Sequence, residues 1–132
     1  MSVFDTKDHT VEFDVKDIEA GRFLSVLAYC WIFVLIPVFA AKDNEFVRFH
    51  RRQGLLLFII QTVYAATISL ILGLCRVTIG NIGVVIVGLL LYAGLIILAA
   101  ASVPGIINAA KGRAKELPYI GILAERFKSK QE

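Results

Sequence analysis

Three long apolar runs, separated by short polar segments, divide the chain. They cover residues 23–41, 55–75 and 84–103, and none of them contains Asp, Glu, Lys or Arg. About 20 residues of helix, at ~1.5 Å per residue, are needed to cross a hydrocarbon core of ~30 Å. Each run is close to that length, so the pattern predicts three transmembrane helices.

The first run has features that a simple crossing would not need. Pro37 removes a backbone hydrogen bond near its end, and Tyr29 and Trp31 lie nearer its middle than an interfacial belt would place them. We expect these aromatic rings to pack against neighbouring helices. A shallow or re-entrant path through the membrane stays open for this run.

Polar segments flank the apolar runs and complete the predicted organisation. Residues 1–22 form an acidic N-terminal arm, residues 23–110 a three-helix membrane domain, and residues 111–132 a basic amphipathic C-terminal tail. The predicted fold class is therefore an all-α integral membrane protein with three transmembrane helices, an acidic N-terminal arm and a short amphipathic C-terminal segment.

The two flanking segments each allow two interpretations. In the arm, residues 10–16 alternate apolar and charged side chains, which predicts a short extended segment. That segment is either a loosely held tail or a strand that pairs with a partner. In the tail, Pro118 can open a short helix, which either lies on the membrane surface or docks on a partner.

The second run carries small and polar residues on one predicted helix face. They recur every four positions, at Gln61, Ala65, Ser69 and Gly73. Small residues in register let helix backbones approach closely, and a glutamine can hydrogen-bond across helices. The pattern favours helix packing, with a polar conduit as the alternative. The run contains no Asp, Glu, Lys, Arg or His side chain, which disfavours ion-coupled transport.

Composition supports a membrane protein and removes other classes. Hydrophobic residues make up 58% of the chain, above the roughly 45–50% that is typical of soluble domains. The net charge of +3 comes from segments beside the apolar runs, so it does not indicate nucleic acid as a partner. Cys30 and Cys75 lie in or at the end of apolar runs, where a thiol behaves as a small hydrophobe.

The distribution of Lys and Arg predicts a topology. The segment between the first two runs and the C-terminal tail hold ten of the 14, whereas the arm and the second connection hold four. Cytoplasmic loops carry the excess of positive charge. We therefore predict a multi-pass protein of the cytoplasmic (inner) membrane, with the N-terminus outside and the C-terminus in the cytoplasm.

Basic and polar residues in these two cytoplasmic segments are candidate contacts for anionic lipid or for a protein partner. They are Arg48, His50, Arg51, Arg52, Lys111, Arg113 and Lys115. If the segments share one membrane face, the arginines near residue 50 can also meet Glu116 or Glu125. The alternative to specific binding is a positive anchor without a ligand of its own.

The chain offers little for catalysis or metal binding. Asp43, Glu45 and His50 form its only cluster of that kind, and a lone histidine without a second soft ligand is weak evidence for a metal site. Nothing in the sequence places a nucleophile beside a base. We predict no enzyme activity, no cofactor and no metal.

Several segments carry a family resemblance. The stretch KDNEFVRFHRRQGLLLFI and the later INAAKGRAKELPYIGILAERF resemble a widespread family of small bacterial and archaeal membrane proteins of unknown function. That family is similar to the twenty-kilodalton subunit of the chloroplast inner-envelope import machinery and to the magnetosome membrane protein MamF. The most specific parts are residues 46–54, 109–112 and 117–121, and the acidic arm lies outside the pattern. The resemblance implies a helical membrane fold, no established enzyme activity, and roles in protein translocation or in organising a membrane compartment.

These observations lead to one functional prediction and one alternative. The prediction is a non-catalytic integral membrane scaffold or accessory subunit, which forms a homo-oligomer or a membrane-protein complex and contacts anionic lipid. The alternative is a component of a protein-translocation or channel complex. Three helices cannot enclose a water-filled path, so the alternative requires an oligomer with Gln61 turned inward.

Overall fold

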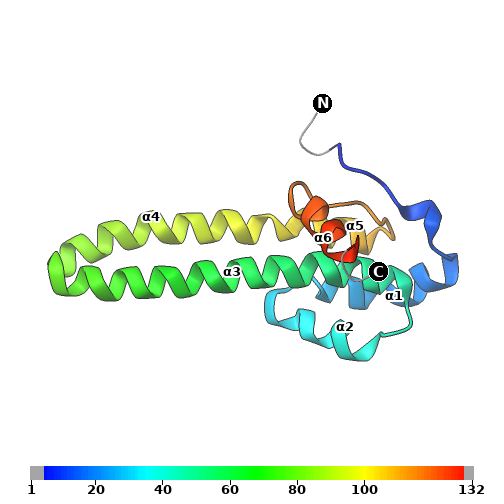
Figure 1. Ribbon diagram of the computed structural model, residues 1–132, viewed down its shortest axis with the longest axis horizontal. Helices are drawn as coiled ribbons and strands as arrows, with labels where there is room; N and C mark the ends of the chain where they lie inside the picture. The colour runs from blue at the N-terminus through cyan, green and yellow to red at the C-terminus, as the bar shows by residue number, and fades with distance from the viewer. Residues whose placement is uncertain (1–4, 130–132) are drawn as a thin grey trace. The chain divides into compact units, whose positions relative to one another are not determined.

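The computed structural model describes residues 5–129, including all side chains except those of residue 125 and residues 127–129. The described residues are mostly helical and divide into two compact units (Figure 1). One unit contains the chain up to residue 58 and again from residue 101, and the other contains residues 59–100. Helix α3 (Glu45–Thr78) begins in the first unit and ends in the second.

The second unit is a hairpin of two antiparallel helices, the later part of α3 and α4 (Gly80–Ala100). Gly80 joins them with φ +71°, a left-handed conformation that glycine adopts without a steric penalty. Between the helices, Gln61 Nε2 donates to the Leu98 carbonyl at 3.0 Å. The Tyr64 hydroxyl donates to the Leu91 carbonyl at 3.1 Å, so side-chain hydrogen bonds connect the two helices.

Two helical segments are long and apolar enough to cross a membrane, by length and composition. They are α3 and the stretch Gly80–Ala110, which combines α4 with α5 (Ser102–Ala110). In their most apolar windows only 17% and 6% of the residues are buried. A core helix of a soluble protein would be mostly buried, so these helices present their apolar side chains outward.

The first unit surrounds the beginning of α3 with short helices. It also contains α5, already described, and its remaining elements are η1 (Thr10–Glu12), α1 (Val15–Leu27), η2 (Trp31–Val34), α2 (Leu35–Ala40) and α6 (Ile120–Ser129). The predicted short helix after Pro118 is therefore present as α6. Two groups of buried side chains hold the unit together, one centred on Tyr29 and Leu57 and the other on Ile18 and Phe46.

The first apolar run does not form a single long helix. Helix α1 starts well before the run, where the Asp14 side chain accepts a hydrogen bond from the Lys16 amide, and it ends at Leu27. Trp31 then takes a positive φ of 51°, and α2 has only six residues. The prediction of three transmembrane helices is therefore not confirmed, because the chain turns within this run instead of continuing through it.

The N-terminal arm is held by the chain itself. The His9 amide donates to the Ala114 carbonyl at 2.8 Å, and the Glu116 amide donates to the Lys7 carbonyl at 3.0 Å. The predicted extended segment over residues 10–16 is wrong, because a 3₁₀ turn and the first turn of α1 occupy it. Pairing does occur, but it begins just before that segment and its partner is this chain's own residues 114–116.

These contacts also correct the predicted topology. Residues 7–9 cannot hydrogen-bond to residues 114–116 if the two segments lie on opposite sides of a membrane. The prediction of an N-terminus outside and a C-terminus in the cytoplasm is therefore incompatible with this fold. An even number of crossings removes the conflict.

Candidate membrane interface

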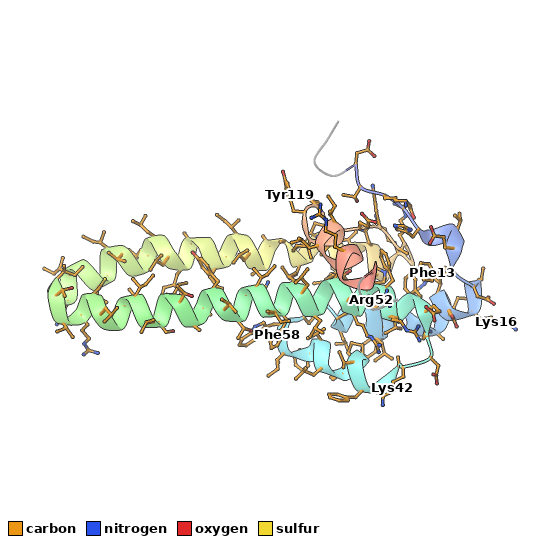
Figure 2. All side chains as sticks on the ribbon, in the orientation of Figure 1. Phe13, Lys16, Lys42, Arg52, Phe58 and Tyr119 are labelled. Carbon is orange, nitrogen blue, oxygen red and sulfur yellow. The ribbon has the colours of Figure 1, made fainter. Side chains whose placement is uncertain are left out.

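The hairpin of the second unit is covered by exposed apolar side chains. Figure 2 shows them projecting outward along both helices. Val63, Leu70, Val77, Ile82 and Leu90 are each between 60% and 87% exposed. Soluble monomers rarely expose contiguous apolar patches larger than a few hundred Å². A surface of this kind is suited to contact with lipid chains.

The predicted small-residue stripe of the second run does not form the hairpin's contact along its whole length. Gln61 is buried against α4, but Ala65 is only half-buried. Ser69 is exposed and its hydroxyl donates to the Ala65 carbonyl at 3.0 Å. A Cβ at Gly73 would meet nothing within 4 Å. Contact with α4 instead passes through Gln61, Tyr64 and Leu72, which share a neighbouring face.

The arginines at the start of α3 bind nearby backbone as well as presenting positive charge. Arg48 pairs with Glu45 at 2.7 Å, and its second Nη donates to the Lys42 carbonyl at 3.0 Å. Arg51 donates to the carbonyl of Val38 at 3.4 Å, near the end of α2, where backbone carbonyls lack helical partners. All three arginines, including Arg52, are half-buried.

His50 is not available to lipid or to a partner, which corrects its prediction as a contact residue. Its side chain is fully buried, and its Nδ1 is hydrogen-bonded to the Tyr29 hydroxyl at 2.8 Å. The rings of Phe46 and Phe49 enclose it, with centroids 4.7 and 5.2 Å away. These residues and Gln53 share the face of α3 that packs into the first unit.

Gln53 makes a structural contact that sequence reasoning missed. Its side-chain oxygen accepts a hydrogen bond from the Leu117 amide at 2.7 Å, and the glutamine is 2% exposed. Next to it, Gly54 packs so closely on Ala28 that a Cβ would lie 1.8 Å from the Ala28 carbonyl oxygen. Two of the three most specific motif segments, residues 46–54 and 117–121, therefore meet in the interior of the first unit.

The basic residues after α5 lie at the surface of the first unit. Lys111 and Arg113 are exposed and Lys115 is half-buried. The Thr10 hydroxyl and amide donate to Asp8, and the charges of Lys115 and Arg113 lie nearby, so the pKa of Asp8 falls below its usual range. Positive charge near residue 113 is thus partly balanced by the acidic arm.

His9 fastens the arm to the segment after α5. Its Nδ1 lies 2.8 Å from a Glu12 oxygen and its Nε2 lies 2.7 Å from a Glu116 oxygen. Carboxylates only accept, so both bonds form together when both ring nitrogens carry hydrogen, in the positively charged imidazolium. Glu116, expected to meet the arginines near residue 50, is thus bound to His9 instead, and the side chain of Glu125 lies outside the described set.

We expect this fastening to weaken as the pH rises. Burial opposes protonation of His9, but its hydrogen bonds to Glu116 and Glu12 outweigh burial and raise the pKa of the imidazole above 6.5. Because the pKa of His9 is higher in the folded state than in the unfolded state, its protonation stabilises the fold. This stabilisation is complete at a pH below the unfolded-state pKa and is lost as the pH rises through the folded-state pKa. Hydrogen exchange at the His9 and Glu116 amides, corrected for intrinsic rates, should therefore accelerate across that range.

The matched variant is His9→Gln, which cannot carry the charge. Its arm should exchange faster than that of the unsubstituted chain at low pH and show no step near the raised pKa of His9. The titratable groups that contact the ring are Glu12 and Glu116; Asp8, the preceding residue, bonds to Thr10 and has the charges of Lys115 and Arg113 nearby. An identical pH step in His9→Gln would assign the transition to one of those groups and contradict the role of His9.

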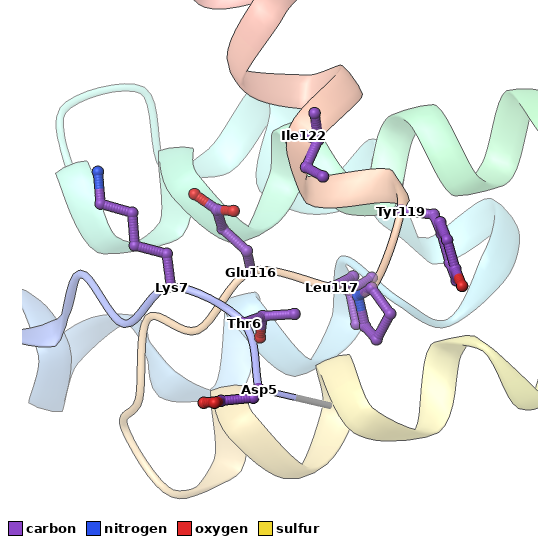
Figure 3. Close-up of a pocket in the computed structure, with 8 residues that line it drawn as sticks. Asp5, Thr6, Lys7, Glu116, Leu117, Tyr119 and Ile122 are labelled. Carbon is purple, nitrogen blue, oxygen red and sulfur yellow. The ribbon is translucent and has the colours of Figure 1, made fainter. Parts of the chain in front are cut away.

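A groove of about 300 Å³ lies between the arm and the segment that leads into α6 (Figure 3). Its lining residues are Asp5, Thr6, Lys7, Glu116, Leu117, Pro118, Tyr119 and Ile122. The carboxylates of Asp5 and Glu116 point in different directions in this view, and that of Glu116 is hydrogen-bonded to His9. Among the side chains that the structure describes, no three of His, Cys, Asp or Glu gather as metal ligands.

Comparison of the chain with protein-family models, with curated proteins and with solved structures finds no match. Its own residues therefore carry the functional inference. The features that bear on it are the exposed apolar hairpin, the basic surface of the first unit and the tightly packed interior beneath that surface.

Proposed function

We propose that the chain is a non-catalytic integral membrane scaffold or accessory subunit, which assembles with itself or with partners and contacts anionic lipid. The exposed apolar surface of the hairpin carries this proposal. The uncharged residues 53–75 of α3 and the 21 residues of α4 each extend about 30 Å or more at ~1.5 Å per residue, which is enough to cross the hydrocarbon core. Lipid is therefore the solvent that this surface fits.

Two crossings give a topology with a strong charge asymmetry. Arg76 is the single Lys or Arg between residues 53 and 110, so the other 13 of the 14 lie in the segments that precede and follow the hairpin. The positive-inside rule then places both ends of the chain in the cytoplasm and the turn near Gly80 outside. This arrangement replaces the predicted outside N-terminus and keeps the cytoplasmic membrane as the proposed location.

The cytoplasmic surface of the first unit supplies the proposed contacts with anionic head groups. Lys111 and Arg113 are exposed there, whereas Arg48 and Arg51 are partly engaged with backbone carbonyls. Each Lys or Arg close to an anionic surface contributes about 1 kcal/mol of attraction. The pair after α5 is therefore the better test of lipid contact than the arginines of α3.

The polar groups of the hairpin give no specific support to the alternative of a channel or translocation component. Gln61 and Tyr64 bond to carbonyls of α4. Thr67 and Ser69 donate to carbonyls one turn earlier in α3, at 2.8 and 3.0 Å. A water-filled path would need several copies of the hairpin and free polar groups. The resemblance to the import-component-like family stays a prediction and adds no residue to this comparison.

The double variant Lys111→Gln, Arg113→Gln should lose anionic lipid. Two charges at about 1 kcal/mol each correspond to roughly a thirtyfold loss of affinity. Native mass spectrometry of the chain extracted in lipid particles of mixed charge measures the bound lipid and the number of copies together. The control is Arg76→Gln, which removes one charge from the opposite side and should change little.

Two outcomes would contradict the proposal. If the double variant binds as much anionic lipid as the unsubstituted chain, the proposed lipid contact is wrong. If the chain is strictly monomeric and has no partners, the proposed scaffold role is wrong. A closed ring that passes a solute would favour the channel instead. Assembly without passage would support the scaffold.

A further inference from the structure

Helix α1 packs alongside the beginning of α3, and the two helices are parallel. Near their starts, the Asn44 side-chain amide donates to the Asp17 carbonyl at 2.9 Å. Near the end of α1, a Cβ at Gly54 would lie 1.8 Å from the carbonyl oxygen of Ala28. Residue numbers therefore rise together along both helices, and the end of α1 lies level with Gly54.

After α1 the chain turns and runs back along α3. Residue numbers in α3 now fall as those in the returning segment rise. Three contacts show this: Trp31 with Phe58 at a ring distance of 6.2 Å, the Val38 carbonyl with Arg51 at 3.4 Å, and the Lys42 carbonyl with Arg48 at 3.0 Å. Residues 15–42 thus form a helical hairpin, whose tip lies level with Phe58.

The hairpin of residues 15–42 is too short to cross a membrane but long enough to enter one leaflet. Its returning arm, η2 and α2, has four and six residues, about 17 Å at ~2.0 and ~1.5 Å per residue. Along α3, Phe58 lies about 10 Å beyond Arg51. One leaflet contributes about 15 Å of hydrocarbon. With the arginines at head-group level, the tip ends inside a single leaflet.

The surface of this tip is apolar and its ends are basic. Trp31, Ile32 and Phe33 are 55%, 51% and 54% exposed. Arg22 and Lys42, which bracket the apolar run, are also exposed, and long cationic side chains suit the phosphate level beside an inserted segment. Phe58, which Trp31 contacts, belongs to the uncharged part of α3 that is proposed to span the membrane, residues 53–75. The apolar tip is therefore continuous with the lipid-facing chain.

We propose that residues 23–41 form a re-entrant hairpin, which inserts into the acyl chains of the leaflet that faces both chain ends. This inference rests on the membrane insertion of α3 and α4 proposed above. We assign lipid rather than a second protein to the surface of the tip, because the tip contacts Phe58 in the uncharged part of α3 and its flanking charges fit phosphate. The hairpin adds protein to one leaflet only, which couples the chain to lipid packing and curvature.

Trp31 is the single tryptophan of the chain and reports directly on this inference. The chain is reconstituted with phospholipids brominated near the head group, at mid-chain or near the terminal methyl. We expect several-fold stronger quenching of Trp31 from the upper and middle positions than from the terminal one, and little quenching by aqueous acrylamide. Strongest quenching from the terminal methyl would indicate a full crossing and overturn the proposal, as would ready quenching by acrylamide.

Single tryptophans at other positions test this inference separately from the proposed membrane insertion of α3 and α4. In a Trp31→Phe background, Leu70→Trp reports on the second unit, and Phe23→Trp and Phe39→Trp report on the two arms of the hairpin, where both phenylalanines are 72% exposed. If Leu70→Trp is quenched by brominated lipid but Trp31 of the unsubstituted chain is not, only the re-entrant hairpin is wrong. If neither tryptophan is quenched, the proposed membrane insertion of the chain is wrong.

Vesicles brominated in one leaflet decide the path of the first run. A re-entrant hairpin requires Phe23→Trp and Phe39→Trp to be quenched from the same leaflet. Quenching from opposite leaflets would show that the run crosses the membrane, and would overturn the inference even if Trp31 is buried in lipid.

Discussion

Gly54→Ala is expected to prevent stable folding of the first unit. The new Cβ would lie 1.8 Å from the carbonyl oxygen of Ala28 and 2.6 Å from its carbonyl carbon. Both obstructing atoms belong to backbone, so no side-chain rotation relieves the clash, and α1 must move away from α3. Overpacking usually costs 1–3 kcal/mol, and we expect a loss above about 3 kcal/mol because the obstacle is rigid. Thermal unfolding in detergent, followed by Trp31 fluorescence, measures it.

The matched control is Gly73→Ala on the same helix. A Cβ at Gly73 would meet nothing within 4 Å, so the substitution adds only helix propensity, worth up to about 1 kcal/mol. We expect this variant to unfold at the same temperature as the unsubstituted chain or slightly above it. If Gly54→Ala were equally stable, the close approach of Ala28 to α3 would be wrong, and with it the parallel course of α1 that the re-entrant hairpin requires.

The second and third apolar runs could be predicted because a hydrocarbon environment imposes a simple rule. It tolerates few charges and demands about 20 residues of helix, and residues 55–75 and 84–103 meet both conditions. The first run meets them as well. A segment that enters and leaves one leaflet needs the same apolar composition as a segment that crosses, so composition could not separate the two paths. The turn at residues 28–31 also lacks Gly and Pro, the usual signals.

The interior of the first unit was only partly predictable. Phe46, Phe49, His50, Gln53 and Leu57 recur at helical spacing, and that spacing could have shown that His50 belongs to a buried face. The arginines between them drew attention to charge instead. The hydrogen bond from the Leu117 amide to Gln53 joins residues that are 64 positions apart, and nothing local in the sequence specifies such a pair. The same holds for the contact of His9 with Glu116.

We expect the two ends of the chain to label from the same side of a sealed membrane. Cys30 and Cys75 are first replaced by alanine, and single cysteines are then introduced by Asp5→Cys, Ile122→Cys or Asn81→Cys, all at exposed positions. A membrane-impermeant thiol reagent should modify the first two variants only in inverted vesicles and the third only in right-side-out vesicles. The effect is close to all-or-none, because a charged reagent does not cross the bilayer.

The labelling pattern tests the fold and the charge rule separately. Labelling of Asp5→Cys and Ile122→Cys from opposite sides would restore three crossings, and it could not coexist with the hydrogen bond between the His9 amide and the Ala114 carbonyl. Labelling of both from the outside would keep two crossings and reject the cytoplasmic assignment made from 13 basic residues against Arg76. Labelling of both from the cytoplasm, with Asn81→Cys outside, places the re-entrant hairpin in the inner leaflet, because the hairpin begins and ends on the same side as the arm.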